Sequence, residues 1–303
     1  MNVDDRMTTP IVLAATDLRE ASDEAIRQAH EWARQRNARL AVCHIVPRLV
    51  GSELLFPQVL QRQAIDQATF EARMAEVVRR RTEALTGRSP DEFDVVVDSG
   101  AADSGILRHA SEVGAALVAV GSHGEAGVTH IFLGDVAARV ARDAHCPVLV
   151  ARPHAATRWI VVGTDLSKAA DWALRFAIEE ARLRNARLAV ATSIERYLRQ
   201  VSWMAEFGAV GNFVEGEYQE ERTKIERQLC QTLKREHIDG HVEVTDAGPA
   251  AVIMEAASRF DAELVVVGAV GAGWLERVRL GRVAEKIIRH APCSVLVARA
   301  PAT

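Results

Sequence analysis

Two glycine runs in this sequence have the residue types and the spacing of a phosphate-binding loop. Each run has two glycines three positions apart and a third glycine ten positions later: Gly121, Gly124 and Gly134 in the first run, and Gly268, Gly271 and Gly281 in the second. Because glycine has no side chain, its backbone amides can approach a phosphate closely. A helix that follows the third glycine would add free amides and the positive end of its dipole. The repeated spacing therefore predicts sites for a phosphate-bearing ligand.

The residue after the third glycine differs in charge between the two runs. In the first run it is Asp135, and a carboxylate about 4 Å from a phosphate charge costs on the order of 4 kcal/mol at an effective dielectric of about 20. Asp135 could instead cap the following helix, or share a bridging Mg²⁺ with a phosphate. In the second run it is Arg282, which could bind a phosphate, point outward, or pair with Glu285 one turn along.

Two aspartates follow the first apolar segment of each half of the chain. Asp17 lies in "IVLAATDLREASDEAI" (11–26) and Asp165 in "IVVGTDLSKAADWAL" (160–174). An aspartate before a helix can act as its N-cap by accepting hydrogen bonds from the first free amides. The same carboxylates could accept a hydrogen bond from a ribose hydroxyl or a base edge. Both interpretations stay open from the sequence.

The chain is an internal duplication of a domain-sized unit. "RNARLAV" occurs at 36–42 and again at 184–190, 148 residues later, and "VLVAR" recurs at 148–152 and 295–299 with a shift of 147. We expect the one-residue slip at "GAADSGI" (100–106), opposite "GPAAVI" (248–253), because loops tolerate changes in length. The repeat predicts two domains, at 1–153 and 158–303.

Apolar strand-like segments alternate with helix-like ones within each copy. Continuous apolar runs such as "ALVAV" and "ELVVV" are typical of parallel strands that are buried on both faces. The alternation predicts a doubly wound α/β sheet of five parallel strands in each domain. In the first copy we expect strands at 11–15, 39–46, 93–97, 116–120 and 147–151 and helices at 22–35, 58–86, 103–112 and 134–143. In the second copy we expect strands at 159–163, 187–193, 241–245, 263–267 and 294–298.

The composition excludes several classes of function. A net charge of −4 gives no general attraction to nucleic acid, and no apolar run approaches the length of a membrane span. The four cysteines form no C-x-x-C pair and the ten histidines show no metal-binding spacing. We therefore expect a soluble cytoplasmic protein that binds no structural metal and does not bind nucleic acid.

On these residues the chain resembles the universal stress protein family, in its tandem two-domain form, over nearly its whole length. The resemblance is carried by Asp17 and Asp165, by the two glycine runs with "GSHG" at 121–124, and by the closing strands "PVLVAR" and "CSVLVAR". It implies an adenine-nucleotide alpha hydrolase-like fold with the strands in the order third, second, first, fourth, fifth. It also implies that the two domains pair through their last strands as a pseudo-dimer within one chain.

The resemblance also implies a nucleotide site in each domain. In ATP-binding members the aspartate contacts the nucleoside, the residue that ends the second strand contacts adenine, and a Ser or Thr after the last glycine holds the phosphates. The implied site residues are Asp17, Val46, Gly121, Gly124, Gly134 and Asp135 in the first domain, and Asp165, Ile194, Gly268, Gly271, Gly281 and Arg282 in the second. Both domains lack the hydroxyl residue, which leaves two expectations open: ATP, with Mg²⁺ when bound, in at least one half, or no cofactor in either half.

These features favour a regulatory protein of the stress response, with a sensor for ATP or a related nucleotide in one half. No general base, nucleophile and orienting acid converge in the sequence, so we expect no enzymatic turnover beyond slow incidental ATP hydrolysis. The alternative is a module that binds a protein or an apolar ligand, with both nucleotide sites decayed. The aromatic stretch 196–218 could pack on its own domain or form such an apolar groove. The partners expected are the other domain, a possible second copy of the chain and an unidentified protein.

Overall fold

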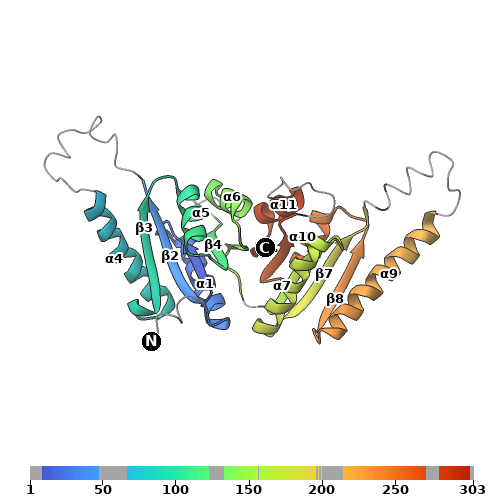
Figure 1. The fold of residues 1–303 in the computed structure, drawn as a ribbon. Coiled ribbons are helices and arrows are strands. Elements are labelled where there is room, and N and C mark those ends of the chain that lie inside the picture. Colours follow the sequence, from blue (N-terminus) through green and yellow to red (C-terminus); the bar gives the residue numbers. More distant parts are fainter. Residues whose placement is uncertain are drawn as a thin grey trace. The chain divides into compact units, whose positions relative to one another are not determined.

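The computed structural model describes residues 9–47, 67–122, 133–155, 157–195, 197, 199, 214–270 and 280–300 (Figure 1). The chain forms two compact units, the first ending at Arg152 and the second continuing from Pro153. Strands and helices alternate along both units. Each unit is an α/β domain, as the sequence predicts.

The first half contains a five-stranded parallel sheet in the order β3-β2-β1-β4-β5, which confirms the expected order. Its strands are β1 (Ile11–Ala15), β2 (Arg39–Val46), β3 (Phe93–Ser99), β4 (Leu117–Gly121) and β5 (Val148–Ala151). Its helices are α1 (Glu20–Gln35), α4 (Gln67–Thr86), α5 (Ala102–Glu112) and α6 (Asp135–Asp143), with a 3₁₀ turn, η2 (Pro90–Glu92). Residues 58–66 of the predicted second helix lie outside the described residues.

The second half repeats this arrangement, with the strands in the order β8-β7-β6-β9-β10 and every pair parallel. Its strands are β6 (Trp159–Thr164), β7 (Arg187–Ser193), β8 (Gly240–Thr245), β9 (Leu264–Gly268) and β10 (Ser294–Ala298). Its helices are α7 (Lys168–Arg184), α9 (Val214–Arg235), α10 (Pro249–Arg259) and α11 (Arg282–His290). The predicted pairing of the two domains through their last strands stays a prediction, as do the boundaries 1–153 and 158–303.

The central strands are buried on both faces, because helices cover each sheet on two sides. In β1 the side chains of Val12, Leu13 and Ala14 are fully buried, although successive side chains point to opposite faces. In the first half α1 packs against α4 and α5 packs against α6, and both pairs contact the sheet. This layering leaves the loops at the carboxyl ends of the strands as the place for a ligand.

The strand register corrects the expected position of the one-residue slip between the halves. Leu40 and Leu188 are 148 residues apart, but their partners on the next strand, Phe93 and Gly240, are 147 apart. The slip therefore lies before β3 and β8, and the expected position at 100–106 is wrong. Sequence similarity alone could not locate it, because the segments between the second and third strands differ too much to align.

Among the described residues, no helix combines the length and the apolar character needed to cross a lipid bilayer.

Candidate functional site

Asp17 lies at the carboxyl edge of the first sheet, two residues after β1, and its side chain is exposed. Its Oδ1 accepts a hydrogen bond from the Arg19 amide at 3.0 Å. Arg19, and not Asp17, is the N-cap of α1. Between them Leu18 has a φ of 64°, in the left-handed region that non-glycine residues seldom adopt. The N-cap interpretation of Asp17 is therefore wrong, because the chain makes one more turn before the helix begins.

The second half has the same turn. Asp165 Oδ1 accepts a hydrogen bond from the Ser167 amide at 3.1 Å, and Leu166 has a φ of 60°. Ser167 is the N-cap of α7, and its Oγ accepts a hydrogen bond from the Ala170 amide at 3.2 Å. Of the Asp and the Ser that the segment "TDLSKAAD" places near the helix start, the Ser is thus the N-cap and Asp165 is not. Its exposed carboxylate, held by the preceding turn, lies at the carboxyl edge of β6.

In the first half, two side chains that sequence reasoning missed brace this turn. Ser22 Oγ lies 2.9 Å from Thr16 Oγ1 and accepts a hydrogen bond from the Asp17 amide at 3.3 Å. His44, on the neighbouring strand β2, places Nδ1 2.8 Å from the carbonyl oxygen of Thr16. The equivalent residues of the second half are Ala170 and Thr192. In the sequence, the one feature that could have indicated this contact was the position of His44 near the end of the second strand, which is the neighbour of the first strand.

The glycine runs begin and end at the same edge of each sheet. The Gly134 amide donates to the carbonyl of Ser122 at 2.9 Å, and the Gly281 amide donates to that of Ala269 at 2.7 Å. These equivalent hydrogen bonds bring the start of α6 and α11 to the ends of β4 and β9. Gly124 and Gly271 lie outside the described residues.

The first glycine of the first run has a packing role of its own. A Cβ atom on Gly121 would lie 2.8 Å from the carbonyl oxygen of Ala21 and 3.1 Å from Cα of Ser22. The absence of a side chain lets the start of α1 approach the end of β4. By contrast, a Cβ atom on Gly281 would meet its nearest neighbour, the Ala269 carbonyl oxygen, at 3.4 Å. Only Gly121 of these two is required by the fold itself.

Glycine occupies the N-cap position of both helices that follow the glycine runs. Gly134 and Gly281 are the N-caps of α6 and α11, and neither cap makes a side-chain hydrogen bond. The expectation that Asp135 caps its helix is wrong, because Asp135 is the first helical residue and points into solvent. Arg282 is exposed at the equivalent position, and Glu285 forms its ion pair with Arg289 at 3.1 Å. Asp135 thus brings a negative charge, and Arg282 a positive charge, beside amides that an anion would use.

Val46 and Ile194 lie at the ends of β2 and β7, at the same edge as the aspartates. Val46 is 2% exposed and its carbonyl accepts a hydrogen bond from the Gly100 amide at 2.9 Å. Ile194 is 4% exposed and its amide donates to the Thr245 carbonyl at 2.8 Å. Each therefore supplies an apolar side chain, fixed by its backbone, below the loops of the site.

The fold places ten of the twelve expected site residues at the carboxyl edges of their own sheets. Such an edge can bind an anion through helix amides and a polar group through an aspartate. Among the described residues, no three His, Cys, Asp or Glu side chains are grouped so as to hold a metal ion.

A largely enclosed histidine lies near this edge in the first half. His109 on α5 places Nε2 3.2 Å from Asp98 and Nδ1 3.0 Å from Glu112, and Arg108 pairs with the same two carboxylates. Burial, and then the positive charge of Arg108, lower the pKa of His109 below its ordinary value of 6.5. The folded protein therefore binds the proton more weakly than the unfolded chain.

The stability of the protein should consequently fall as the pH drops below 6.5, where the unfolded chain takes up a proton first, and continue to fall through the lower pKa of folded His109. His109→Gln should reduce this loss, since glutamine does not titrate. Urea unfolding of both proteins at neutral pH and at about pH 5 would measure the difference. An unchanged loss of stability in the variant would contradict the prediction. His30→Gln is the companion variant, because burial and Arg88 also lower the pKa of His30.

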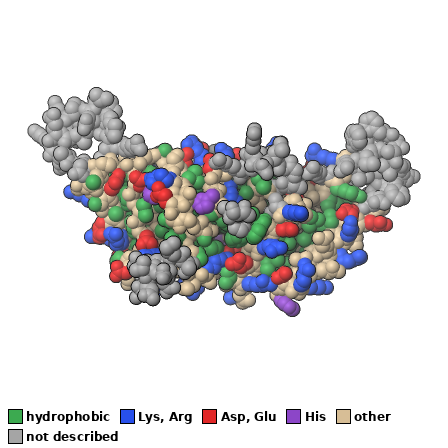
Figure 2. Space-filling view, in the orientation of Figure 1, with side chains coloured by type: hydrophobic (Ala, Val, Ile, Leu, Met, Phe, Trp, Pro, Cys, Tyr) green, Lys and Arg blue, Asp and Glu red, His purple; other side chains and the backbone are tan. Residues whose placement is uncertain are grey.

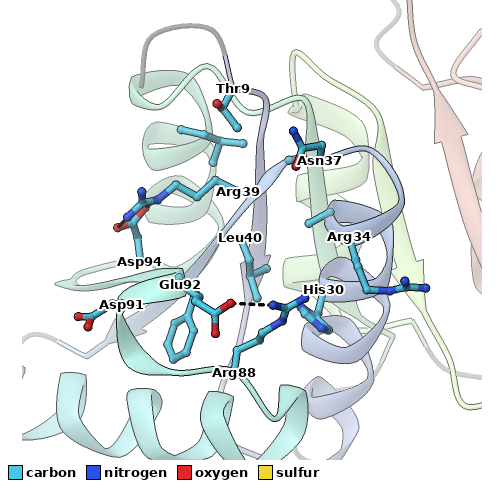
Figure 3. A pocket seen from close by; sticks show the side chains of 14 residues that line it. Thr9, His30, Arg34, Asn37, Arg39, Leu40, Arg88, Asp91, Glu92 and Asp94 are labelled. Carbon is cyan, nitrogen blue, oxygen red and sulfur yellow. Dashed lines mark hydrogen bonds and ion pairs between the residues drawn. The ribbon is translucent and has the colours of Figure 1, made fainter. Parts of the chain in front are cut away.

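A cavity in the first half lies away from the predicted site. It has a volume of about 640 Å³ and is formed around the amino ends of β1, β2 and β3 (Figure 3). Its cations are paired with acids: Arg39 contacts Asp94 at 2.5 and 2.7 Å, and Arg88 contacts Glu92 at 2.6 Å. The carboxyl edge is therefore the better candidate for an anionic ligand.

Comparison with known proteins gives a match on each half of the chain. The model of the universal stress protein family matches residues 9–152 and again 157–299. A universal stress protein of Mycobacterium tuberculosis is 24% identical over 315 aligned residues, which span 96% of this chain and 95% of the relative. The crystal structure of a universal stress protein from Archaeoglobus fulgidus matches 96% of this chain and 99% of its own, with a TM-score of 0.66 and 19% identity. A universal stress protein solved in complex with cAMP matches 47% of this chain, with a TM-score of 0.32 and 24% identity.

Proposed function

Since the chain belongs to the universal stress protein family and carries its domain twice, we propose that it is a regulatory protein that binds ATP or a related nucleotide in its second half. The site comprises Asp165, Ile194, Gly268, Gly271, Gly281 and Arg282. The first half, with Asp135 at the equivalent of Arg282, binds nucleotide more weakly or not at all.

The observation that carries this proposal is the charge at the first residue of the helix after each glycine run. Arg282 is exposed at the start of α11, beside a turn whose glycine cap makes no side-chain hydrogen bond. A guanidinium there adds charge-assisted hydrogen bonds to those of the helix amides. In the first half the same backbone arrangement ends in the carboxylate of Asp135, which repels a phosphate. The two halves share their scaffold and differ in the sign of this charge.

The other residues of the second half suit the rest of a nucleotide. Asp165 presents a carboxylate, held by the Ser167 amide, that can accept a hydrogen bond from a ribose hydroxyl or a base edge. Ile194, directly after β7, is buried and gives the site an apolar floor. When bound with ATP, Mg²⁺ would neutralise part of the phosphate charge. These groups bind and orient, and they supply no base for turnover, so we propose sensing with at most slow incidental hydrolysis.

The test is to denature freshly purified protein and to identify any released nucleotide by chromatography, followed by titration of ATP and Mg²⁺ into the emptied protein. Stoichiometric nucleotide, or a thermal shift that saturates with ATP, supports the proposal. If no nucleotide is released and ATP gives no thermal shift, the proposal is wrong. That result would favour the alternative, a protein-interaction module with decayed nucleotide sites, for which Asp135 in the first half is the supporting observation.

Asp135→Ser should create or strengthen binding in the first half. The change removes one repulsive charge and restores the hydroxyl that ATP-binding relatives carry there. With solvent screening halving the roughly 4 kcal/mol expected at 4 Å, the gain is about 2 kcal/mol, or about thirtyfold in affinity. Calorimetric titration would count a second site per chain. Arg142→Ser, in the last turn of the same helix, is the control; equal effects of both variants, or no gain, would show that Asp135 does not block the site.

A further inference from the structure

The outer face of α7 carries an apolar stripe. Trp172, Phe176 and Leu183 recur at helical spacing on the side of the helix away from the buried Ala173 and Ala177. Trp172 is 38% exposed, Leu183 is 39% exposed and Phe176 is half-buried. Figure 2 shows hydrophobic side chains among charged ones on the face of the second half where α7 lies. Large apolar side chains that line up on a surface indicate a contact more often than isolated ones do.

The first half has no such stripe, although its α1 is the duplicate of α7. The residues 148 positions earlier are Glu24, Gln28 and Gln35. These polar side chains bond along their own helix: Gln28 donates to Glu24 at 2.8 Å and Gln35 donates to Glu31 at 2.8 Å. The common fold therefore does not require apolar residues at these positions. The stripe is a property acquired by the second half alone.

The charged side chains beside the stripe are complementary to those of a second, antiparallel copy of the same helix. Asp171, Arg175, Glu179 and Arg182 are all exposed and follow one flank of the stripe. If a second α7 lies antiparallel against the first, with the two-fold axis near Ala177, Asp171 faces Arg182 of the other copy and Arg175 faces Glu179. The same axis places Trp172 opposite Leu183. Each pair then occurs twice, as a two-fold symmetric contact requires.

From this pattern we propose that the outer face of α7 is an interface between two copies of this chain, which associate through antiparallel α7 helices. In the single chain the guanidinium of Arg175 lies 5.9 Å from the centre of the Trp172 ring and so borders the stripe, whereas Arg182 pairs with Glu236 at 2.7 Å and would exchange this partner for Asp171 of the other copy. A parallel arrangement would instead place the two charged rows on opposite sides of the contact, where they could not pair. The proposal is independent of nucleotide binding.

A single helix pair buries less than the roughly 1,200 Å² of a standard stable interface. The dimer should therefore be weak and depend on protein concentration, which suits a contact that forms as the protein accumulates. Sedimentation velocity of the full chain over a concentration series would measure the association constant.

Trp172→Glu, which places the acid of the first half in the second, should weaken association at least tenfold. Arg175→Glu and Glu179→Arg should each weaken it about tenfold, because each puts two pairs of like charges face to face. The double variant Arg175→Glu/Glu179→Arg restores opposite charges and should recover the association of the native chain. Val77→Glu is the matched control, since Val77 is exposed (45%) on α4 of the first half. Circular dichroism of each variant verifies folding.

Three results would overturn the proposal. The native chain could remain monomeric throughout the concentration series, which would mean that the stripe does not bind a second copy and would favour another protein as its partner. It could dimerise with an association constant that Trp172→Glu does not change, which would place the interface elsewhere. Finally, the double charge reversal could fail to restore association, which would exclude the antiparallel arrangement.

Discussion

Replacing Arg282 by aspartate should weaken the binding of ATP to the second half about a thousandfold. The change removes an attractive charge and adds a repulsive one beside the first turn of α11, where Gly281 leaves the helix without a side-chain cap. Arg282 is exposed, so each unit of charge is worth about 2 kcal/mol after screening, half of the value expected at 4 Å and a dielectric of about 20. The total of about 4 kcal/mol corresponds to three decades in affinity.

Calorimetric titration of ATP with Mg²⁺ would measure this loss, and a salt series would test its electrostatic origin. The matched control is Arg289→Asp, which changes the same charge in the last turn of α11, where Arg289 pairs with Glu285 at 3.1 Å. If Arg289→Asp weakened ATP binding as much as Arg282→Asp, the effect would come from net charge and the assignment of Arg282 would fail.

Gly121→Ala should destabilise the protein by up to about 3 kcal/mol, the upper end for overpacking of a close-packed interior. The added Cβ would lie 2.8 Å from the Ala21 carbonyl oxygen and 3.1 Å from Cα of Ser22. Both contacts are with backbone, so the start of α1 has to move away from the end of β4. This movement would also displace Asp17, two residues after β1. Urea unfolding would report the loss in the free energy of unfolding.

Gly281→Ala is the matched control, from the other glycine run. Its Cβ would meet the Ala269 carbonyl oxygen at an ordinary 3.4 Å, and the φ of −79° suits alanine. Because alanine is a poorer N-cap than glycine, we expect a loss of about 0.5 to 1 kcal/mol, well below the loss at Gly121. If the two substitutions destabilised the protein equally, the close approach of α1 to Gly121 would not be the cause of the loss in the free energy of unfolding.

The fold could be predicted from the sequence because its main signal is local. Strands such as Leu117–Gly121 are short, apolar and bounded by polar turns, and the duplication provides two readings of every element. The starts of α1 and α7 could not be predicted, because Asp17 and Asp165 have the residue type of an N-cap. The true helix start depends on Leu18 and Leu166, which adopt the left-handed conformation. This conformation is unusual for leucine, so the residue type does not predict it.

The candidate site could be predicted only as far as it is encoded by motif residues. The aspartates and glycines were found from their positions and spacing, and Val46 and Ile194 were implied by the resemblance to the family. Ser22 and His44 were missed, because their contacts with the turn after β1 depend on which strands are neighbours. The role of the aromatic stretch 196–218 stays a prediction, since most of it lies outside the described residues.

The slip of one residue between the halves shows how this molecule tolerates changes in length. Within a strand, a deletion would turn every later side chain to the opposite face of the sheet and expose its core residues. Here the deletion lies in the connection before the third strand, so Phe93 and Gly240 keep equivalent places beside Leu40 and Leu188. A change of one residue in that connection therefore leaves the pairing of the sheet unchanged, so the two halves can differ in length there while their strands stay equivalent.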